Sequence, residues 1–179
     1  IESYQVPKFN SNLGKLDKIE FILTGNFKGA SRTENLSNSP VTITLKNSVR
    51  FKQTIFNNYY IFDEILTRTD IFNALPWDGS FPPDWQGNSG HQFLFDNYVT
   101  QTFILENSDT GSLALFTGTG DILLAVQAHD VSSTSMSGPN IVASQFENAK
   151  SIISTIRYHY TPVPESKVFG YVGIFFCVL

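Results

Sequence analysis

The sequence predicts an all-β protein, an antiparallel β-sandwich of jelly-roll-like or immunoglobulin-like type with at most one or two short helices. Three observations support this class. Apolar and polar residues alternate in several segments, turn-forming clusters separate these segments, and the 179 residues include 16 Phe but only 16% charged residues. Such alternation is typical of strands buried on one face. We expect residues 1–162 to form the sandwich and residues 163–179 to form a C-terminal tail.

The clearest alternation predicts strands in four segments, which are 19–23, 41–45, 122–128 and 152–160. Clusters of Asn, Ser, Thr, Gly and Pro predict turns between strands. These clusters lie at 10–14, 24–26, 35–40, 107–111, 117–120 and 132–140. Two further segments, 59–73 and 143–151, are compatible with one or two helical turns but lack helix-capping residues at both ends.

Composition and motifs exclude several classes of function. The net charge of −4 argues against nucleic acid, whose phosphates require a basic surface. Cys177 is the only cysteine, so an internal disulfide is impossible. The sequence has no G-x-S-x-G, H-E-x-x-H or glycine-rich phosphate motif. Its histidines are His91, His129 and His159, of which His129 lies at the end of a predicted strand and His159 within one, both ordinary positions. We therefore predict a protein that is not an enzyme.

The segment 75–91 differs from the rest because it contains both tryptophans and three of the eight prolines. We expect a long irregular loop, and such loops often bind ligands. Trp77 and Trp85 could stack on the apolar face of a sugar, or they could fold inward and attach the loop to the sandwich. Asp78, Asp84 and Asn88 offer oxygen ligands for Ca²⁺, or they could accept hydrogen bonds from their own turns. No other cofactor is indicated.

In the C-terminal segment 168–179, both the odd-numbered and the even-numbered residues are apolar, so both faces of a strand formed by them would be apolar. A β-strand of this kind must be buried on both faces. It could be the last strand of its own sandwich, closing it, or it could insert beside a strand of a neighbouring chain and build a head-to-tail fibre. The residues predicted to make this contact are Val168, Phe169, Tyr171, Val172, Ile174, Phe175, Phe176 and Val178. The segment is too short for a stable transmembrane helix, which needs about 20 apolar residues.

The step Val163-Pro164-Glu165 before this apolar segment resembles the PEP-CTERM sorting signal of bacteria. Ser166 stands where that signal has a second proline, and no basic cluster follows the apolar run. In that system a membrane protease is thought to recognise the motif and to release or anchor the protein. The first residues lack the basic and apolar regions of a signal peptide, and we expect that one has been removed.

The body of the chain is similar to the choice-of-anchor E domain family. Residues 6–16 resemble the opening "LPxFDPSLGTL" of that family, residues 113–120 match its "LxxFTGTG" segment, and residues 156–165 resemble its "VTYTYTPVPE" ending. The family is known mainly from cyanobacteria and related bacteria. The resemblance implies a secreted protein displayed at, or released from, the cell surface, and it implies no enzyme activity.

Taken together, these features predict a structural or adhesive protein of the bacterial cell surface or extracellular matrix. We expect the protein to associate with copies of itself. One such assembly would be a fibre built by β-strand complementation. The alternative is a lectin-like module that binds exopolysaccharide through the loop containing Trp77 and Trp85.

Overall fold

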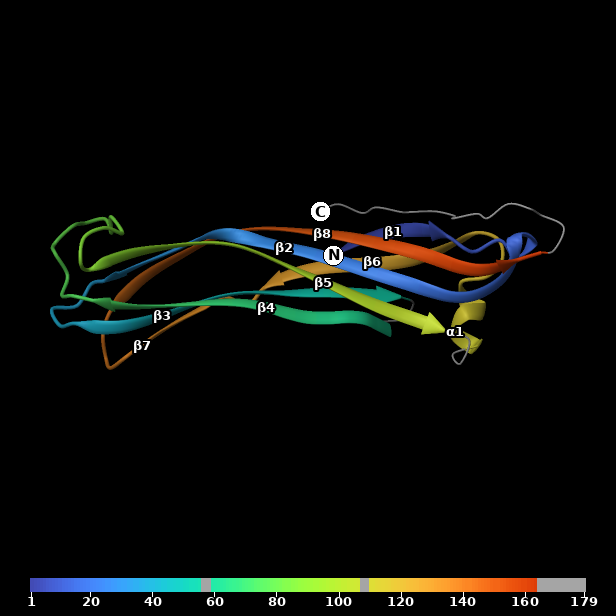
Figure 1. Cartoon of the computed structure of the whole chain (residues 1–179). Coiled ribbons are helices and arrows are strands. Elements are labelled where there is room, and N and C mark those ends of the chain that lie inside the picture. Colours follow the sequence, from blue (N-terminus) through green and yellow to red (C-terminus); the bar gives the residue numbers. More distant parts are fainter. Residues whose placement is uncertain (56–58, 107–109, 164–179) are drawn as a thin grey trace.

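Two antiparallel sheets lie face to face in the computed structural model, which describes residues 1–55, 59–106 and 110–163 (Figure 1). The first sheet has the order β1 (Glu2–Pro7), β6 (Asp121–Asp130), β3 (Val41–Ile55) and β4 (Tyr59–Ala74), with β7 (Ser133–Met136) also paired to β3. The second has the order β5 (Gly90–Glu106), β2 (Gly14–Asn35) and β8 (Val142–Pro162). The predicted antiparallel β-sandwich is confirmed.

Helices are short within the described ranges. A 3₁₀ helix occupies Ser11–Leu13, and α1 occupies Thr110–Leu115. In this part of the chain, no helix combines the length and the apolar character that crossing a membrane requires.

The central strand β2 confirms the strand predicted at 19–23 but corrects the turn predicted at 24–26. Ile19, Phe21 and Leu23 are fully buried, and the strand continues without interruption to Asn35. Gly25 lets the two sheets pack closely, because a Cβ at this position would lie 2.8 Å from the ring of Phe51. A glycine inside a strand can therefore mark a close approach of the opposite layer as well as a turn.

The helical turns considered at 59–73 and 143–151 are wrong, because both segments are strands. The first lies in β4, which pairs with β3, and the second begins β8, which pairs with β2 from Val142 to Pro162. Residues such as Ala, Asn and Glu have low intrinsic preference for strands, and pairing with a long neighbour overrides that preference here.

The cluster of turn residues at 132–140 is only partly a turn. It contains β7, which continues β6 in the same register along β3. The strand is interrupted where the N–H of Val131 donates to the carbonyl oxygen of Ser48 (3.0 Å) and the N–H of Ser48 donates to Oγ of Ser132 (3.2 Å). A side-chain acceptor thus replaces one main-chain partner, and the extended path resumes.

The space between the sheets contains two apolar clusters. The larger one takes inward residues of β2, β3, β6 and β8, including Phe21, Phe27, Phe51, Leu124 and Ile156. The smaller one consists of Val41, Ile43, Leu45 and Ala74. Asn47 follows the smaller cluster along β3, is fully buried, and donates from Nδ2 to Oγ of Ser31 (3.0 Å). Polar contacts therefore occur within the sandwich interior as well as at its surface.

Candidate functional site

The loop 75–89 joins β4 of the first sheet to β5 of the second at one end of the sandwich (Figure 1). It contains no helix or strand, as predicted for 75–91, whereas Gly90 and His91 of the predicted loop begin β5. Asn35, the last residue of β2, holds it in place. Nδ2 of Asn35 donates to the carbonyl oxygens of Ser39 and Leu75, both at 2.8 Å, and its backbone N–H donates to the carbonyl oxygen of Ser89 (2.9 Å). Both ends of the loop are therefore tied to the same residue.

Glu34 is fully buried beneath this loop. Its Oε2 accepts a hydrogen bond from the backbone N–H of Trp85 (3.1 Å), and its Oε1 accepts one from the hydroxyl of Ser89 (3.4 Å). Sequence reasoning missed this residue as part of the site. Alternation along β2 places Glu34 on the outward face of its sheet, where a carboxylate is normally exposed, and only the path of the loop covers it.

Three carboxylates come together at this point. Oxygen atoms of Glu34, Asp78 and Asp84 all lie within 4.8 Å of one another. The structure thus brings together two of the three residues predicted to bind Ca²⁺ and adds Glu34 to them. For the third, Asn88, the backbone carbonyl oxygen accepts the N–H of Leu75 (2.9 Å). Carboxylate oxygens are suitable Ca²⁺ ligands, and calcium binding stays a prediction.

The two aspartates also stabilise turns of the loop. Oδ1 of Asp78 accepts the backbone N–H of Ser80 (3.0 Å), and Oδ1 of Asp84 accepts that of Gln86 (3.0 Å). Hydrogen bonds from the backbone and then the hydroxyl of Ser80 hold the pKa of Asp78 below its usual value. Asp78 is thereby kept ionised to lower pH, and these contacts are the turn-stabilising ones that aspartates commonly make in such loops.

Both tryptophans are half-buried and contribute hydrogen bonds to the loop. Nε1 of Trp77 donates to the carbonyl oxygen of Ser80 (3.3 Å), and its backbone N–H donates to that of Ser37 (2.9 Å). Trp85 has a φ of +61°, an uncommon value for a residue other than glycine. The most exposed aromatic side chain of the loop is Phe81, at 81%. Sequence reasoning did not single it out, because an isolated phenylalanine gives no sign of its exposure.

A second polar cluster lies on the side of the sandwich, where β4 and β5 approach each other. Nε2 of His91 lies 2.6 Å from Oδ2 of Asp70, and the imidazole stacks on the ring of Phe72 at 4.6 Å. These contacts link the two sheets. Within the described ranges, His91 has no hydrogen bond to a serine, threonine or cysteine side chain, so the pair is not extended to a nucleophile there.

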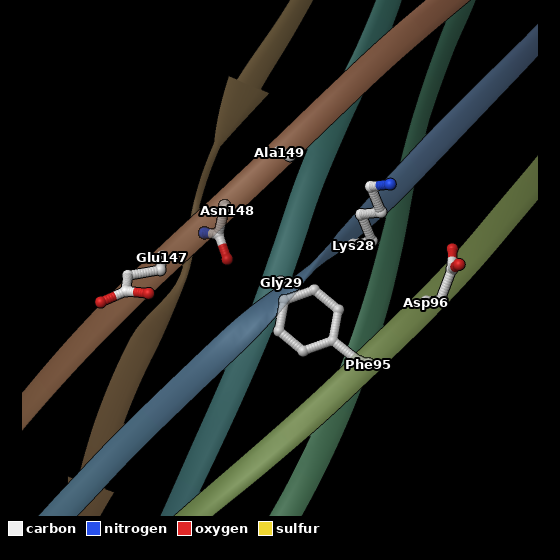
Figure 2. Close-up of a pocket in the computed structure, with 7 residues that line it drawn as sticks. All are labelled: Lys28, Gly29, Phe95, Asp96, Glu147, Asn148 and Ala149. Carbon is white, nitrogen blue, oxygen red and sulfur yellow. The ribbon is translucent and has the colours of Figure 1, made fainter.

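An open hollow of about 490 Å³ lies where β2, β5 and β8 run side by side (Figure 2). Gly29 lies within it, and Phe95 is the register partner of Gly29 on β5. The charged side chains of Lys28, Asp96 and Glu147 belong to its lining and point away from Gly29 in Figure 2. The hollow therefore offers a polar molecule few convergent groups.

The predicted tail contacts lie outside the described residues. This applies to Val168, Phe169, Tyr171, Val172, Ile174, Phe175, Phe176 and Val178, and also to Pro164 and Glu165 of the sorting motif. The remaining motif residue, Val163, follows β8 directly, and its N–H donates to the carbonyl oxygen of Leu13 (3.3 Å).

Comparison of the chain with protein-family models, with curated proteins and with solved structures found no match. The similarity to the choice-of-anchor E domain family and to PEP-CTERM signals therefore stays a prediction from the sequence.

Proposed function

We propose that this chain is a secreted, non-enzymatic structural or adhesive protein of the bacterial cell surface or extracellular matrix. It assembles by β-strand complementation, in which the apolar segment 168–179 of one chain adds to a free sheet edge of the next. The low charge, the Ser- and Thr-rich strands and the sorting motif at 163–165 support the location.

The observation that supports the proposal is that both sheets have open edges. Each sheet ends in edge strands, which are β1, β4 and the short β7 in the first and β5 and β8 in the second. The outer backbone groups of an edge strand are available to an additional strand, which is how donor-strand complementation gains its hydrogen bonds. A long two-sheet molecule with exposed edges suits a subunit of an extended assembly.

The sequence supplies a segment of suitable character next to this sandwich. Odd-numbered and even-numbered residues of 168–179 are both apolar. A strand formed by them would therefore be stabilised by burial of both its faces. Five residues separate Val168 from Pro162, the last residue of β8. The segment therefore remains covalently close to one sandwich while another molecule provides its binding edge.

Deletion of residues 168–179 tests this assembly. We expect the full chain to form oligomers that depend on the tail, and the deleted chain to lose these oligomers and to sediment more slowly. A variant with Ser and Thr in place of the same apolar residues controls for chain length and should sediment as the deleted chain does. Identical sedimentation of the full and deleted chains would contradict the proposed assembly.

A second candidate function is polysaccharide binding by the loop 75–89. The observation that favours it is the exposure of Phe81 beside the half-buried Trp77 and Trp85. An exposed aromatic ring can stack on the apolar face of a sugar.

Retention on immobilised exopolysaccharide tests this second function. We expect the W77A/W85A double variant and the F81A variant each to lose retention. The F81A variant is the cleaner one, because its ring is exposed and its loss leaves the loop's hydrogen bonds in place. A Leu123→Ala variant removes an exposed side chain from a different region and controls for surface changes in general. Unchanged retention of F81A and W77A/W85A would exclude the loop.

A further inference from the structure

Strand β5 presents a long free edge. Its seventeen residues, Gly90–Glu106, pair with β2 on one side only. On the other side, the described part of the chain provides no strand partner for it. Alternate N–H and C=O groups of an edge strand point away from its neighbour, so β5 offers a row of donors and acceptors to an additional strand.

The other edge strands carry more of the features that discourage such pairing than β5 does. Charged residues occur repeatedly on β4, at Asp63, Glu64, Arg68 and Asp70, and on β8, at Glu147, Lys150 and Arg157. Strand β1 has only six residues and ends at Pro7. Between Gln92 and Leu105, β5 has a single charged side chain, Asp96. Charges, prolines and short length are the usual protections of natural sheet edges.

Both faces of β5 also present apolar surface. On the outward face, Leu94 is 68% exposed, Tyr98 is 73% exposed and Ile104 is 41% exposed. On the inward face, Phe93 and Phe103 are half-buried and pack against the main core. A strand added beside β5 would cover apolar atoms on both faces, which adds burial to the new hydrogen bonds.

We propose that β5 pairs antiparallel with β5 of a second copy of this chain, about a twofold axis near Tyr98. The two three-stranded sheets would then join into one continuous sheet. A register centred on Tyr98 places Phe93 opposite Phe103 of the second copy and Asp96 opposite Thr100. No two like charges oppose each other in this register, so the edge is complementary to itself.

A second copy fits this edge better than the tail of the same chain. The order of the sheet is β5, β2, β8, and the chain leaves β8 at Pro162, on the far side of β2 from the free edge. The tail would have to cross the end of the sheet beside the 3₁₀ helix Ser11–Leu13 to reach β5. This pairing uses no tail residue, and it is therefore a contact distinct from the proposed tail complementation.

A charge-exchange experiment on the full-length chain tests the pairing. In Y98K and in Y98D, like charges face each other across the axis, and we expect the association constant measured by sedimentation to fall about tenfold or more. An equimolar mixture of Y98K and Y98D should restore dimers, because opposite charges then meet. The I71K variant is the matched control, since Ile71 is 64% exposed on the edge strand β4, and it should associate as the wild type does.

Disulfide trapping provides a second measurement. In a C177S background, which removes the native thiol, Y98C should oxidise to a covalent dimer and I71C should not. The pairing is overturned if Y98K associates as tightly as I71K, if mixing fails to restore dimers, or if Y98C traps no dimer.

The two proposals fail separately. If deletion of 168–179 abolishes assembly while Y98K has no effect, the β5 pairing is wrong and the tail complementation stands. If Y98K weakens association and the deletion has no effect, the β5 pairing stands and the tail complementation is wrong.

Discussion

Glu34 shows how a single residue can hold a loop. Its carboxylate has no exposed surface and accepts hydrogen bonds from the N–H of Trp85 and the hydroxyl of Ser89. A buried donor without its acceptor costs about 1–3 kcal/mol. The residue therefore ties the loop 75–89 to the end of β2 more strongly than an exposed contact would.

Two substitutions at Glu34 test this role by chemical denaturation. We expect E34A to lower the free energy of unfolding by about 1–3 kcal/mol, because the N–H of Trp85 loses its acceptor. E34Q keeps one carbonyl oxygen and should lose less. The E64A variant, at an exposed position on β4 outside the loop, serves as the control and should lose little. Equal stability of E34A and the wild type would show that the contact contributes nothing to the fold.

At the scale of the elements, glycines in β2 allow its neighbours to approach closely. A Cβ at Gly29 would lie 2.0 Å from the backbone oxygen of Glu147 on β8, whereas one at Gly25 would meet the side-chain ring of Phe51 at 2.8 Å. A ring can shift by rotation of its side chain, but a paired backbone cannot move without changing the strand pairing. The two positions should therefore respond differently to an added methyl group.

We accordingly expect G29A to be the more destabilising of the two variants, by about 1–3 kcal/mol relative to the wild type, and G25A to cost less. Urea denaturation of both variants measures the order. K28A, at the exposed neighbouring position on β2, controls for substitution in this strand. A larger loss in G25A than in G29A would contradict this account of the strand contacts.

The strands that the sequence predicted well are those with strong alternation. Ile19, Phe21 and Leu23 in β2, like Ile122, Leu124 and Val126 in β6, are fully buried, as the pattern requires. The segments 59–73 and 143–151 lack such a clear pattern, and sequence reasoning considered helical turns there. Their state depends on pairing with β3 and β2, which are distant in sequence, so local preference could not reveal it.

At the scale of the whole molecule, polar contacts cross between the sheets. Oη of Tyr158 on β8 donates to the carbonyl oxygen of Pro7 on β1 (2.8 Å). Nε2 of Gln53 on β3 donates to Oγ of Ser154 on β8 (2.8 Å). Such contacts add directional links to an interface that is otherwise held by apolar packing.

Burial raises the pKa of Tyr158 well above its ordinary value of 10.0. Well below pH 10.0, the phenol is neutral in both the folded and the unfolded chain, and its contribution to stability is complete. As the pH rises further, the unfolded chain releases the proton while the folded chain retains it. The free energy of unfolding should therefore fall with pH in this range.

The Y158F variant tests the alkaline loss of stability. We expect it to lose about 1 kcal/mol at neutral pH, because the hydrogen bond to Pro7 is removed. Above pH 10.0, its stability should fall less steeply than that of the wild type. L123A removes an exposed side chain without a titratable group and should follow the wild type. Parallel pH profiles for Y158F and the wild type would refute the linkage.

Of the candidate site, the sequence determined the loop and its unusual residues, including Trp77, Trp85, Asp78 and Asp84. It could not place Glu34 beside the aspartates, because that contact joins residues far apart in the chain. It also could not tell which aromatic ring of the loop is exposed. Exposure depends on how the loop 75–89 folds over the end of β2, and no local pattern records that path.

By itself the sequence determined the fold class and the strands with strong alternation. In a strand buried on one face, every second residue is apolar, and this pattern can be recognised within a short segment of the chain. It also determined the low charge of β5. Only the tertiary structure decided that β5 lies at a sheet edge while β2 lies between two neighbours. Strand order is set by contacts between distant segments, and whether a nearly uncharged strand is covered or open to a second molecule depends on that order.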